Sequence, residues 1–163
     1  MVIVLMGPAG AGKTTVGKAL AADLGWTFVD GDDYHSPANV SRMQSGVGLS
    51  DSERDAWLRD LHALIAQRMG RRDQMVLACS ALKAGYRDVL RGDLRPVRFV
   101  YLKAPRPVLE SRLELRPRHF AGPALLHSQL LDFEDPGETA VTVDATRELD
   151  VLVPEIRREL GLL

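Results

Sequence analysis

Cysteine is nearly absent from the sequence, which contains Cys79 and no other. A single cysteine excludes an intramolecular disulfide, and it argues against a cysteine-based metal site, which needs several such ligands close together. The sequence therefore fits a reducing compartment, where disulfides rarely form.

Long apolar runs and blocks of one charge are absent too. No run approaches the ~20 apolar residues that a membrane-spanning helix needs, and the apolar run 2–6 has no charged segment of a signal peptide before it. The formal net charge is −1, and no basic run occurs. We therefore expect a cytoplasmic protein with no nucleic-acid partner and no membrane partner.

The sequence does contain alternating strand-like and helix-like segments. Its 163 residues, 45% of them hydrophobic, suffice for one domain with a core, spanning residues 1–163. Short apolar runs predict strands at 2–6, 26–29, 75–80, 97–102 and 140–144. Helical spacing of apolar residues predicts helices at 13–24, 39–45, 50–70, 83–90, 105–116, 124–131 and 148–160. Strands that alternate with helices predict an α/β fold with a parallel sheet covered on both faces.

Residues 7–14 read G-P-A-G-A-G-K-T, which matches the phosphate-binding P-loop pattern G-x-x-x-x-G-K-[ST]. The motif lies between the strand 2–6 and the helix 13–24, as a P-loop must. Glycines let the backbone turn its N–H groups toward phosphate oxygens, and the helix adds its positive N-terminal end. We expect Lys13 to reach the β- and γ-phosphates of a nucleotide and Thr14 to ligate Mg²⁺.

Two carboxylates follow the second strand, where ligands of open α/β sheets bind. Asp30 and Asp32 flank Gly31. One carboxylate can hold Mg²⁺ through its waters, and the other can accept the proton of an attacking hydroxyl. We assign the metal to Asp30, which is nearer the strand, and the base to Asp32, which lies farther out.

Two absences narrow the class of P-loop protein. The sequence has no N-K-x-D motif, which argues against a GTPase, and its third strand ends at Cys79 and Ser80 without an aspartate. Metal support should therefore come from the second strand, as in kinases of small molecules and nucleotides.

Arg112 and Arg116 stand four residues apart, on one face of a predicted helix, just before a loop rich in proline and glycine. Such a pair can clamp phosphate oxygens when a loop closes. We predict a lid over about residues 116–126, with Arg116 engaging the nucleotide phosphates on closure.

Two further motifs are specific, D-G-D-x-x-H at 30–35 and C-S-A-L-K-x-x-Y-R at 79–87. Weaker ones are N-x-x-x-M-x-x-G at 39–46, the segment 49–58 with Asp51, Arg54 and Trp57, E-S-R-L-x-x-R-x-x-H-F at 110–120, and S-Q at 128–129. Together with the P-loop, these motifs resemble those of the bacterial-type gluconokinases over most of the chain.

The resemblance implies a three-layer P-loop kinase fold with strand order 2-3-1-4-5. It also implies transfer of a phosphoryl group from ATP, with Mg²⁺, to the 6-hydroxyl of D-gluconate, and possible homodimers. The residues it marks for the nucleotide are Gly7, Gly10, Ala11, Gly12, Lys13, Thr14, Thr15, Arg112 and Arg116. Those it marks for the acceptor are Asp32, His35, Arg54, Lys83, Arg87 and His119.

Two other readings stay open at this point. A kinase of the same fold could act on another small hydroxy acid such as shikimate, although that reading does not predict the motif at 79–87. A nucleotide-binding module without turnover would bind ATP and release no ADP in response to an acceptor. A candidate base and a lid argue against this second reading.

Overall fold

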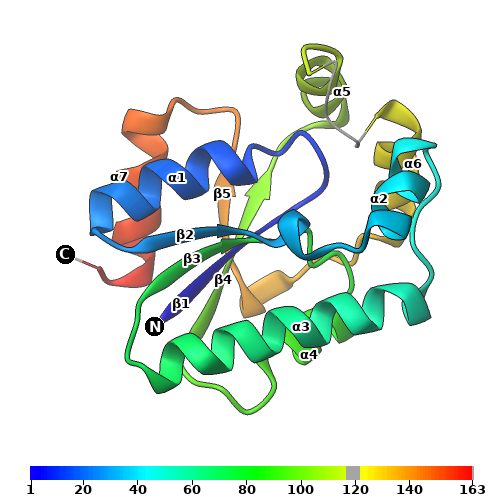
Figure 1. Cartoon of the computed structure of the whole chain (residues 1–163). Coiled ribbons are helices and arrows are strands. Elements are labelled where there is room, and N and C mark those ends of the chain that lie inside the picture. Colours follow the sequence, from blue (N-terminus) through cyan, green and yellow to red (C-terminus); the bar gives the residue numbers. More distant parts are fainter. Residues whose placement is uncertain (117–121, 163) are drawn as a thin grey trace.

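The computed structural model describes residues 1–116 and 122–162 and contains a five-stranded parallel sheet (Figure 1). The strand order is β2-β3-β1-β4-β5, as expected. The strands are β1 (Val2–Met6), β2 (Thr27–Asp30), β3 (Met75–Ala78), β4 (Val97–Lys103) and β5 (Val141–Asp144).

Helices cover both faces of the sheet (Figure 1). On one face, α1 (Lys13–Leu24) lies beside α7 (Leu149–Leu160), and on the other α3 (Asp51–Gly70) lies beside α4 (Ala84–Arg91). Each face has its own hydrophobic cluster, the first including Leu20 and Ile156, the second Leu61 and Leu90. The three-layer α/β architecture is therefore confirmed.

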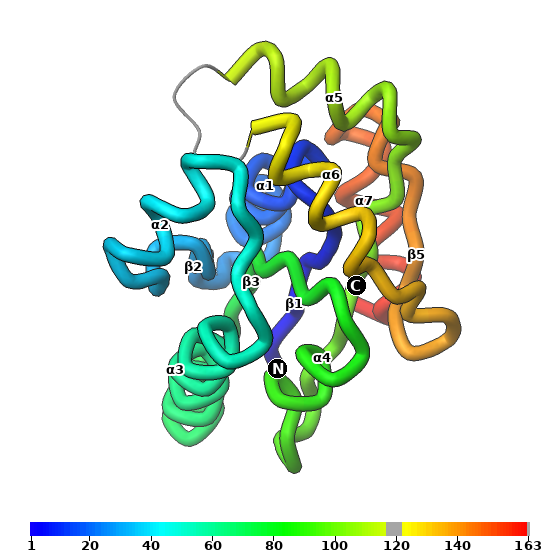
Figure 2. Tube along the Cα trace, turned by 90° about the vertical axis from the view of Figure 1, so that its right-hand side faces the viewer, coloured from blue at the N-terminus to red at the C-terminus, as the bar shows by residue number. Residues whose placement is uncertain are grey.

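Three further helices lie together beyond one end of the sheet, as Figures 1 and 2 show. They are α2 (Pro37–Gln44), α5 (Arg106–Glu114) and α6 (Pro123–Asp132), and the short 3-10 turns are η1 (Gly31–Tyr34) and η2 (Gly137–Thr139). Within residues 1–116 and 122–162, no helix is long and apolar enough to cross a membrane.

Strand β1 is the central strand of the sheet, and all five of its side chains are fully buried. Its register pairs Val4 with Leu77 of β3 and with Phe99 of β4. The residue after β1 therefore emerges between two neighbouring strands, and Gly7 donates its N–H to the Ser80 carbonyl over 3.1 Å. This position places the P-loop at the carboxyl edge of the sheet.

A capping box fixes the start of α3. Ser50 accepts a hydrogen bond from the Glu53 N–H over 3.2 Å, and the Glu53 carboxylate accepts one from the Ser50 N–H over 2.8 Å. Two N–H groups of the helix end are thereby satisfied. The box fixes the first turn of the helix that carries Arg54 and Trp57.

Strand β2 begins and ends one residue later than the pattern predicts. Trp26 donates its N–H to the Ala21 carbonyl over 2.8 Å, so it belongs to the turn that closes α1. At the other end, Asp30 pairs in register with Ala78. Asp30 is thus the last residue of the strand, and its backbone is held by the sheet rather than by a loop.

Candidate active site

The P-loop takes a conformation that only glycine tolerates at its tip. Gly10 has φ +84°, and a Cβ on it would lie 2.7 Å from the Leu109 carbonyl oxygen. Both the backbone angle and the close approach of α5 therefore exclude a side chain. The loop ends at Gly12, the N-cap of α1, so the N–H groups of the first helical turn face the loop.

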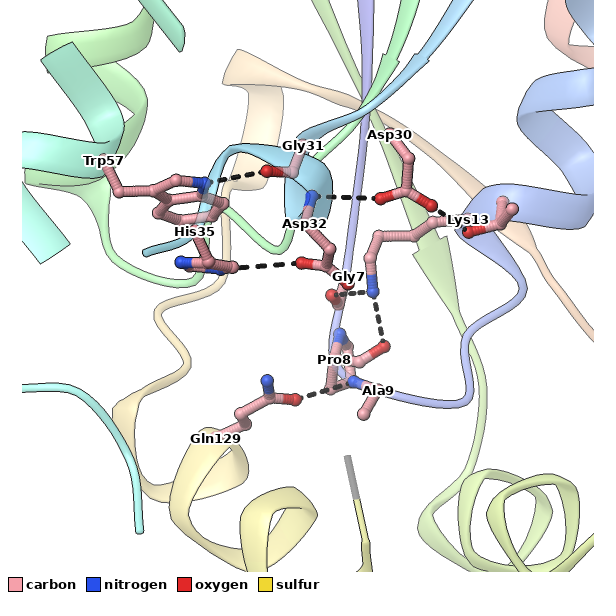
Figure 3. A network of polar contacts seen from close by, with 11 residues as sticks. Gly7, Pro8, Ala9, Lys13, Asp30, Gly31, Asp32, His35, Trp57 and Gln129 are labelled. Carbon is pink, nitrogen blue, oxygen red and sulfur yellow. Dashed lines mark hydrogen bonds and ion pairs between the residues drawn. The ribbon is translucent and has the colours of Figure 1, made fainter. Parts of the chain in front are cut away.

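Lys13 lies across the loop from which it comes. Its Nζ donates to the carbonyl oxygens of Gly7, over 2.9 Å, and Pro8, over 3.0 Å (Figure 3). Burial lowers the pKa of the Lys13 ammonium, while the carboxylates of Asp32 and Asp30 act in the opposite direction. The ammonium is therefore placed beside the loop and held near two carboxylates.

Thr14 and Asp30 form the first polar pair of the site. The Thr14 hydroxyl donates to Asp30 Oδ2 over 2.9 Å, and Asp30 Oδ1 accepts the N–H of Asp32 over 3.0 Å. This hydroxyl and carboxylate are both oxygen ligands, the type that Mg²⁺ prefers. Within the described residues no group of three His, Cys, Asp or Glu side chains could hold a metal by itself. The pair fits a metal that takes its other ligands from phosphate and water.

Asp32 points to different partners from Asp30, although the two are separated by one glycine. A Cβ on Gly31 would lie 2.6 Å from the Ala78 carbonyl oxygen, so glycine lets the turn η1 lie against β3. Past this turn, Asp32 Oδ1 is 3.6 Å from Nε2 of His35 (Figure 3). Asp30 thus faces α1, and Asp32 faces His35.

His35 is held in place by Trp57 of α3. The two rings stack with centroids 4.1 Å apart and planes 19° apart. Trp57 also donates from Nε1 to the Gly31 carbonyl over 2.8 Å. One tryptophan therefore supports both the turn that carries Asp32 and the ring beside it.

These groups line one cavity at the carboxyl edge of the sheet. Its polar lining includes Lys13, Asp32, Arg54 and Arg116. Its other lining residues are Ala9, Gly10, Gly12, Thr14, Asp30, His35, Met43, Leu49, Trp57, Ala78, Ser80, Leu125 and Gln129. The cavity thus joins the P-loop to a mixed polar and apolar wall.

Arg54 is the buried cation of this wall. Its relative exposure is 5%, its guanidinium lies 5.0 Å from the centroid of the Tyr86 ring, and its Nε has no hydrogen-bond partner among the described residues. A buried donor without a partner is costly and rare. The position therefore suits an anionic ligand.

A second cavity, of about 490 Å³, meets the first at Gly12 and Arg116. Arg112 lines the second cavity and donates to the carbonyls of Gly10 (3.3 Å), Ala11 (3.4 Å) and Ala145 (2.6 Å). The remaining lining residues are Ala11, Thr15, Val16, Leu115, Thr146, Arg147, Glu148, Leu149 and Leu152. Arg112 thus joins the P-loop to the segment after β5.

The structure brings together most of the residues that the sequence singled out. Those lining one or both cavities are Gly10, Ala11, Gly12, Lys13, Thr14, Thr15, Asp30, Asp32, His35, Arg54, Arg112 and Arg116. Gly7 starts the loop behind them. His119 and residues 117–121 of the predicted lid lie outside the described residues.

Two expected acceptor residues line neither cavity. Lys83 is 3.2 Å from Asp51 and 3.8 Å from Asp132. Arg87 is buried, and its guanidinium donates to the carbonyls of Ala81 (2.8 Å), Leu82 (3.1 Å) and Glu134 (3.1 Å). Both side chains therefore connect segments that are distant in the sequence, behind the cavity wall.

Two contributions could not be found from the sequence. Gln129 was part of the S-Q motif but had no role, and its amide accepts the N–H of Ala9 over 2.7 Å. Trp57 was part of the motif at 49–58 but had no role, and it is buried in the cavity wall and donates to the Gly31 carbonyl. No local sequence pattern predicts either contact, because each joins residues that are far apart in the chain.

Cys79 is buried at the end of β3, and burial raises the pKa of its thiol to about 12. A thiol at this pKa stays protonated near neutral pH and is a poor nucleophile. Cys79 therefore acts as a small packing residue of the hydrophobic core.

Comparison with known proteins places these features in context. The profile of a protein family described as an AAA domain matches residues 2–136. A gluconokinase of Gluconobacter oxydans is 42% identical over 158 residues, which cover 96% of this chain and 89% of that protein.

Two solved structures are similar over nearly the whole chain. A gluconokinase from Sinorhizobium meliloti 1021 is 40% identical with a TM-score of 0.83, covering 98% of this chain and 91% of that one. An unliganded sugar kinase from Janibacter sp. HTCC2649 is 36% identical with a TM-score of 0.92, covering 99% and 94%.

Proposed function

The chain belongs to the gluconokinase family of P-loop kinases, and on that basis we propose that it transfers the γ-phosphoryl group of ATP to the 6-hydroxyl of D-gluconate. The products are ADP and 6-phospho-D-gluconate. The observation that carries the proposal is that Lys13 of the P-loop, Asp32 and the buried Arg54 line one cavity. A cation for phosphate, a base for a hydroxyl and a cation for a carboxylate are thus within one site.

The P-loop and the second cavity account for ATP. We assign the phosphates to the N–H groups between Gly10 and Thr14, with Lys13 exchanging its loop carbonyls for phosphate oxygens. The 490 Å³ cavity is of the size of small-molecule sites and begins where the loop ends, so we assign the nucleoside to it. Thr15 and Arg112 then lie beside the nucleotide.

Thr14 and Asp30 fit Mg²⁺ as an oxygen-rich pair next to the phosphates. We propose that Thr14 ligates the ion and that Asp30 holds its waters. When bound, the ion supplies charge neutralisation at the β- and γ-phosphates. The chain's own contribution there is Lys13, whose ammonium acts on the same charge.

Gluconate is an anion with several hydroxyls, and the opposite wall matches both properties. Arg54 is buried, and its Nε has no hydrogen-bond partner within the described part of the chain, so we assign it to the acceptor carboxylate. His35 borders the polyol, and Asp32 orients the 6-hydroxyl and takes its proton as the bond to phosphorus forms. Because phosphoryl transfer depends mostly on positioning, the support of His35 by Trp57 belongs to the site.

The lid stays a prediction. We propose that residues 116–126 close over the nucleotide, that Arg116 then neutralises the transferring group, and that His119 reaches the acceptor. Arg116 supports this by lining both cavities. Hydrogen exchange across 116–126 should slow when an ATP analogue and gluconate are both present, and equal exchange with and without ligands would exclude a ligand-gated lid.

Lys83 and Arg87 enter the proposal indirectly. Arg87 holds the carbonyls of Ala81 and Leu82, and Lys83 bridges Asp51 and Asp132. We propose that both act on the acceptor by fixing the wall from which Arg54 projects. A cytoplasmic location and a homodimer also stay predictions, the second testable by light scattering.

A coupled assay of ADP release over a panel of sugar acids, with shikimate included, tests the proposal. Gluconate should be the best acceptor, and ³¹P and ¹³C NMR should place the phosphate on carbon 6. A shikimate-type kinase would prefer shikimate. A binding module would retain ATP and release no ADP with any acceptor.

A further inference from the structure

Gln129 connects α6 to the P-loop. Its Oε1 accepts the N–H of Ala9 over 2.7 Å, although the two residues are 120 positions apart (Figure 3). Ala9 is 6% exposed, so this N–H would otherwise be a poorly hydrated donor. The bond therefore fixes the loop tip and the glutamine side chain with respect to each other.

The chemistry of this bond fixes the orientation of the amide. A backbone N–H can only donate, so the oxygen of Gln129 must face Ala9 and the NH₂ group must face away. Figure 3 shows Nε2 on the side of the amide turned away from Ala9. Within residues 1–116 and 122–162 this nitrogen donates no hydrogen bond. Gln129 thus brings two N–H donors to a cavity that it lines together with Asp32, His35 and Arg54.

Helix α6 is also packed closely against the rest of the protein. Leu125 and Leu126 are buried, with relative exposures of 2% and 0%. The segment before α3 packs so closely that a Cβ on Gly48 would lie 2.6 Å from Ser128 Oγ. Gln129 is therefore presented from a fixed helix and not from a mobile loop.

We propose that Gln129 is a specificity-determining residue for the acceptor, donating from Nε2 to a hydroxyl oxygen of the gluconate chain while its Oε1 holds Ala9. The proposal rests on the function proposed above and adds to it the group that recognises a hydroxyl other than the reacting one. One side chain then contacts both the phosphate-binding loop and the acceptor. Acceptor binding is thereby coupled to the position of the loop tip.

A deoxy analogue measures this contact directly. If Nε2 donates to one hydroxyl, gluconate lacking that hydroxyl leaves the donor unsatisfied and lowers kcat/KM by about 10- to 100-fold in the wild type. The four singly deoxygenated gluconates, at carbons 2, 3, 4 and 5, cover every hydroxyl that is not phosphorylated. One of these four analogues should show the fall in kcat/KM, because it lacks the hydroxyl that Gln129 binds.

Two substitutions distinguish the role of the acceptor Oε1 of Gln129 from that of its donor Nε2. Gln129→Glu keeps an oxygen for the Ala9 N–H and removes the donors, while Gln129→Met has similar length and removes both. We expect the penalty for one deoxy analogue to fall to about one- to threefold in both variants, because the lost donor no longer distinguishes the substrates. His127→Ala, an exposed change on the same helix, should keep the wild-type penalty.

Two results would contradict the role of Gln129, and a third would overturn the proposed function itself. If every wild-type penalty persists in both variants while KM for ATP rises in Gln129→Met, then Gln129 acts on the P-loop alone and the proposal is wrong. A penalty that is lost in Gln129→Met and kept in Gln129→Glu also contradicts it, since the donors are absent from both. A wild-type chain that does not phosphorylate gluconate overturns the proposed function, and this inference with it.

Discussion

The indole ring of Trp57 stacks on the imidazole ring of His35, with centroids 4.1 Å apart. Since His35 faces Asp32 across 3.6 Å, the stack ties α3 to the carboxylate that we propose as the base. The same indole donates to Gly31, the residue between the two aspartates. The geometry of the acceptor side therefore depends on a residue that touches neither carboxylate.

Trp57→Phe should keep an aromatic face and lose the bond to Gly31. The buried carbonyl left unsatisfied should cost about 1–3 kcal/mol in the free energy of unfolding, measured in urea. Trp57→Leu should in addition lower kcat/KM for gluconate by about 2- to 10-fold, the value of a lost aromatic pair. Trp26→Phe, at the only other tryptophan, is the control and should leave kinetics unchanged.

Lys13→Ala should lower kcat by about 10² or more, because it removes a preorganised cation from the transferring phosphoryl group. Far-UV circular dichroism should show an intact fold. Lys18→Ala, an exposed lysine on the same helix, should be nearly as active as the wild type. Near-normal turnover by a folded Lys13→Ala would refute the assignment of the P-loop.

Asp32→Asn should lower kcat by about 10² to 10⁴, the usual range for a lost general base. The apparent affinity for ATP should change little, since Lys13 and Thr14 remain. Asp30→Asn should instead raise the Mg²⁺ concentration needed for half-maximal rate, because it removes the negative charge from the group that pairs with Thr14. Mg²⁺ and gluconate titrations of both variants separate the two roles.

A reversed result is informative for this pair. If excess Mg²⁺ restores Asp32→Asn fully, then Asp32 serves the metal, and the assignments of the two aspartates are exchanged. Normal turnover by Asp32→Asn would show that another residue is the base.

Arg112→Ala should raise KM for ATP by about 10- to 100-fold, the effect of losing charged hydrogen bonds. Its guanidinium holds the carbonyls of Gly10, Ala11 and Ala145 where the two cavities meet. KM for gluconate should stay close to that of the wild type. Arg106→Ala on the same helix, where an exposed arginine pairs with Glu110 over 2.6 Å, is the matched control.

Tyr86→Phe should make stability less sensitive to acid, because it removes a bond that stabilises the charged form of the Asp51 carboxyl. The hydroxyl of Tyr86 donates to Asp51, and this bond, followed by that from Lys83, lowers the pKa of the Asp51 carboxyl from 3.8. A carboxyl with a lowered folded pKa contributes stability that is present above its unfolded pKa and lost as pH falls through the folded pKa. Above about pH 4 the urea midpoint of the variant should therefore be lower than that of the wild type, and the difference should shrink toward about pH 2.

Measurements of the urea midpoint from pH 2 to 7 check this expectation. Tyr34→Phe, at an exposed tyrosine, should reproduce the wild-type profile. A Tyr86→Phe profile that is parallel to wild type at every pH would mean that the bond to Asp51 contributes no pH-dependent stability.

Local sequence determined the parts of this protein whose requirements are local. The P-loop could be predicted because its residues are contiguous. Its Gly10 is required because the residue there must adopt φ +84° against the backbone of α5. The capping box of Ser50 and Glu53 is a local feature of the same kind, because both of its bonds span three residues. The alternation of strands and helices likewise followed from periodicity, which depends only on which side of an element faces the core.

Tertiary structure decided what each polar side chain does. Arg54 and Arg87 are both buried arginines. Arg87 is surrounded by three carbonyls, whereas the Nε of Arg54 at the cavity has no partner among residues 1–116 and 122–162. Gln129 reaches Ala9 only because α6 packs across the end of the sheet. A hydrogen bond is set by positions within about 3 Å, and residues far apart in the chain reach such positions only when the whole core has packed.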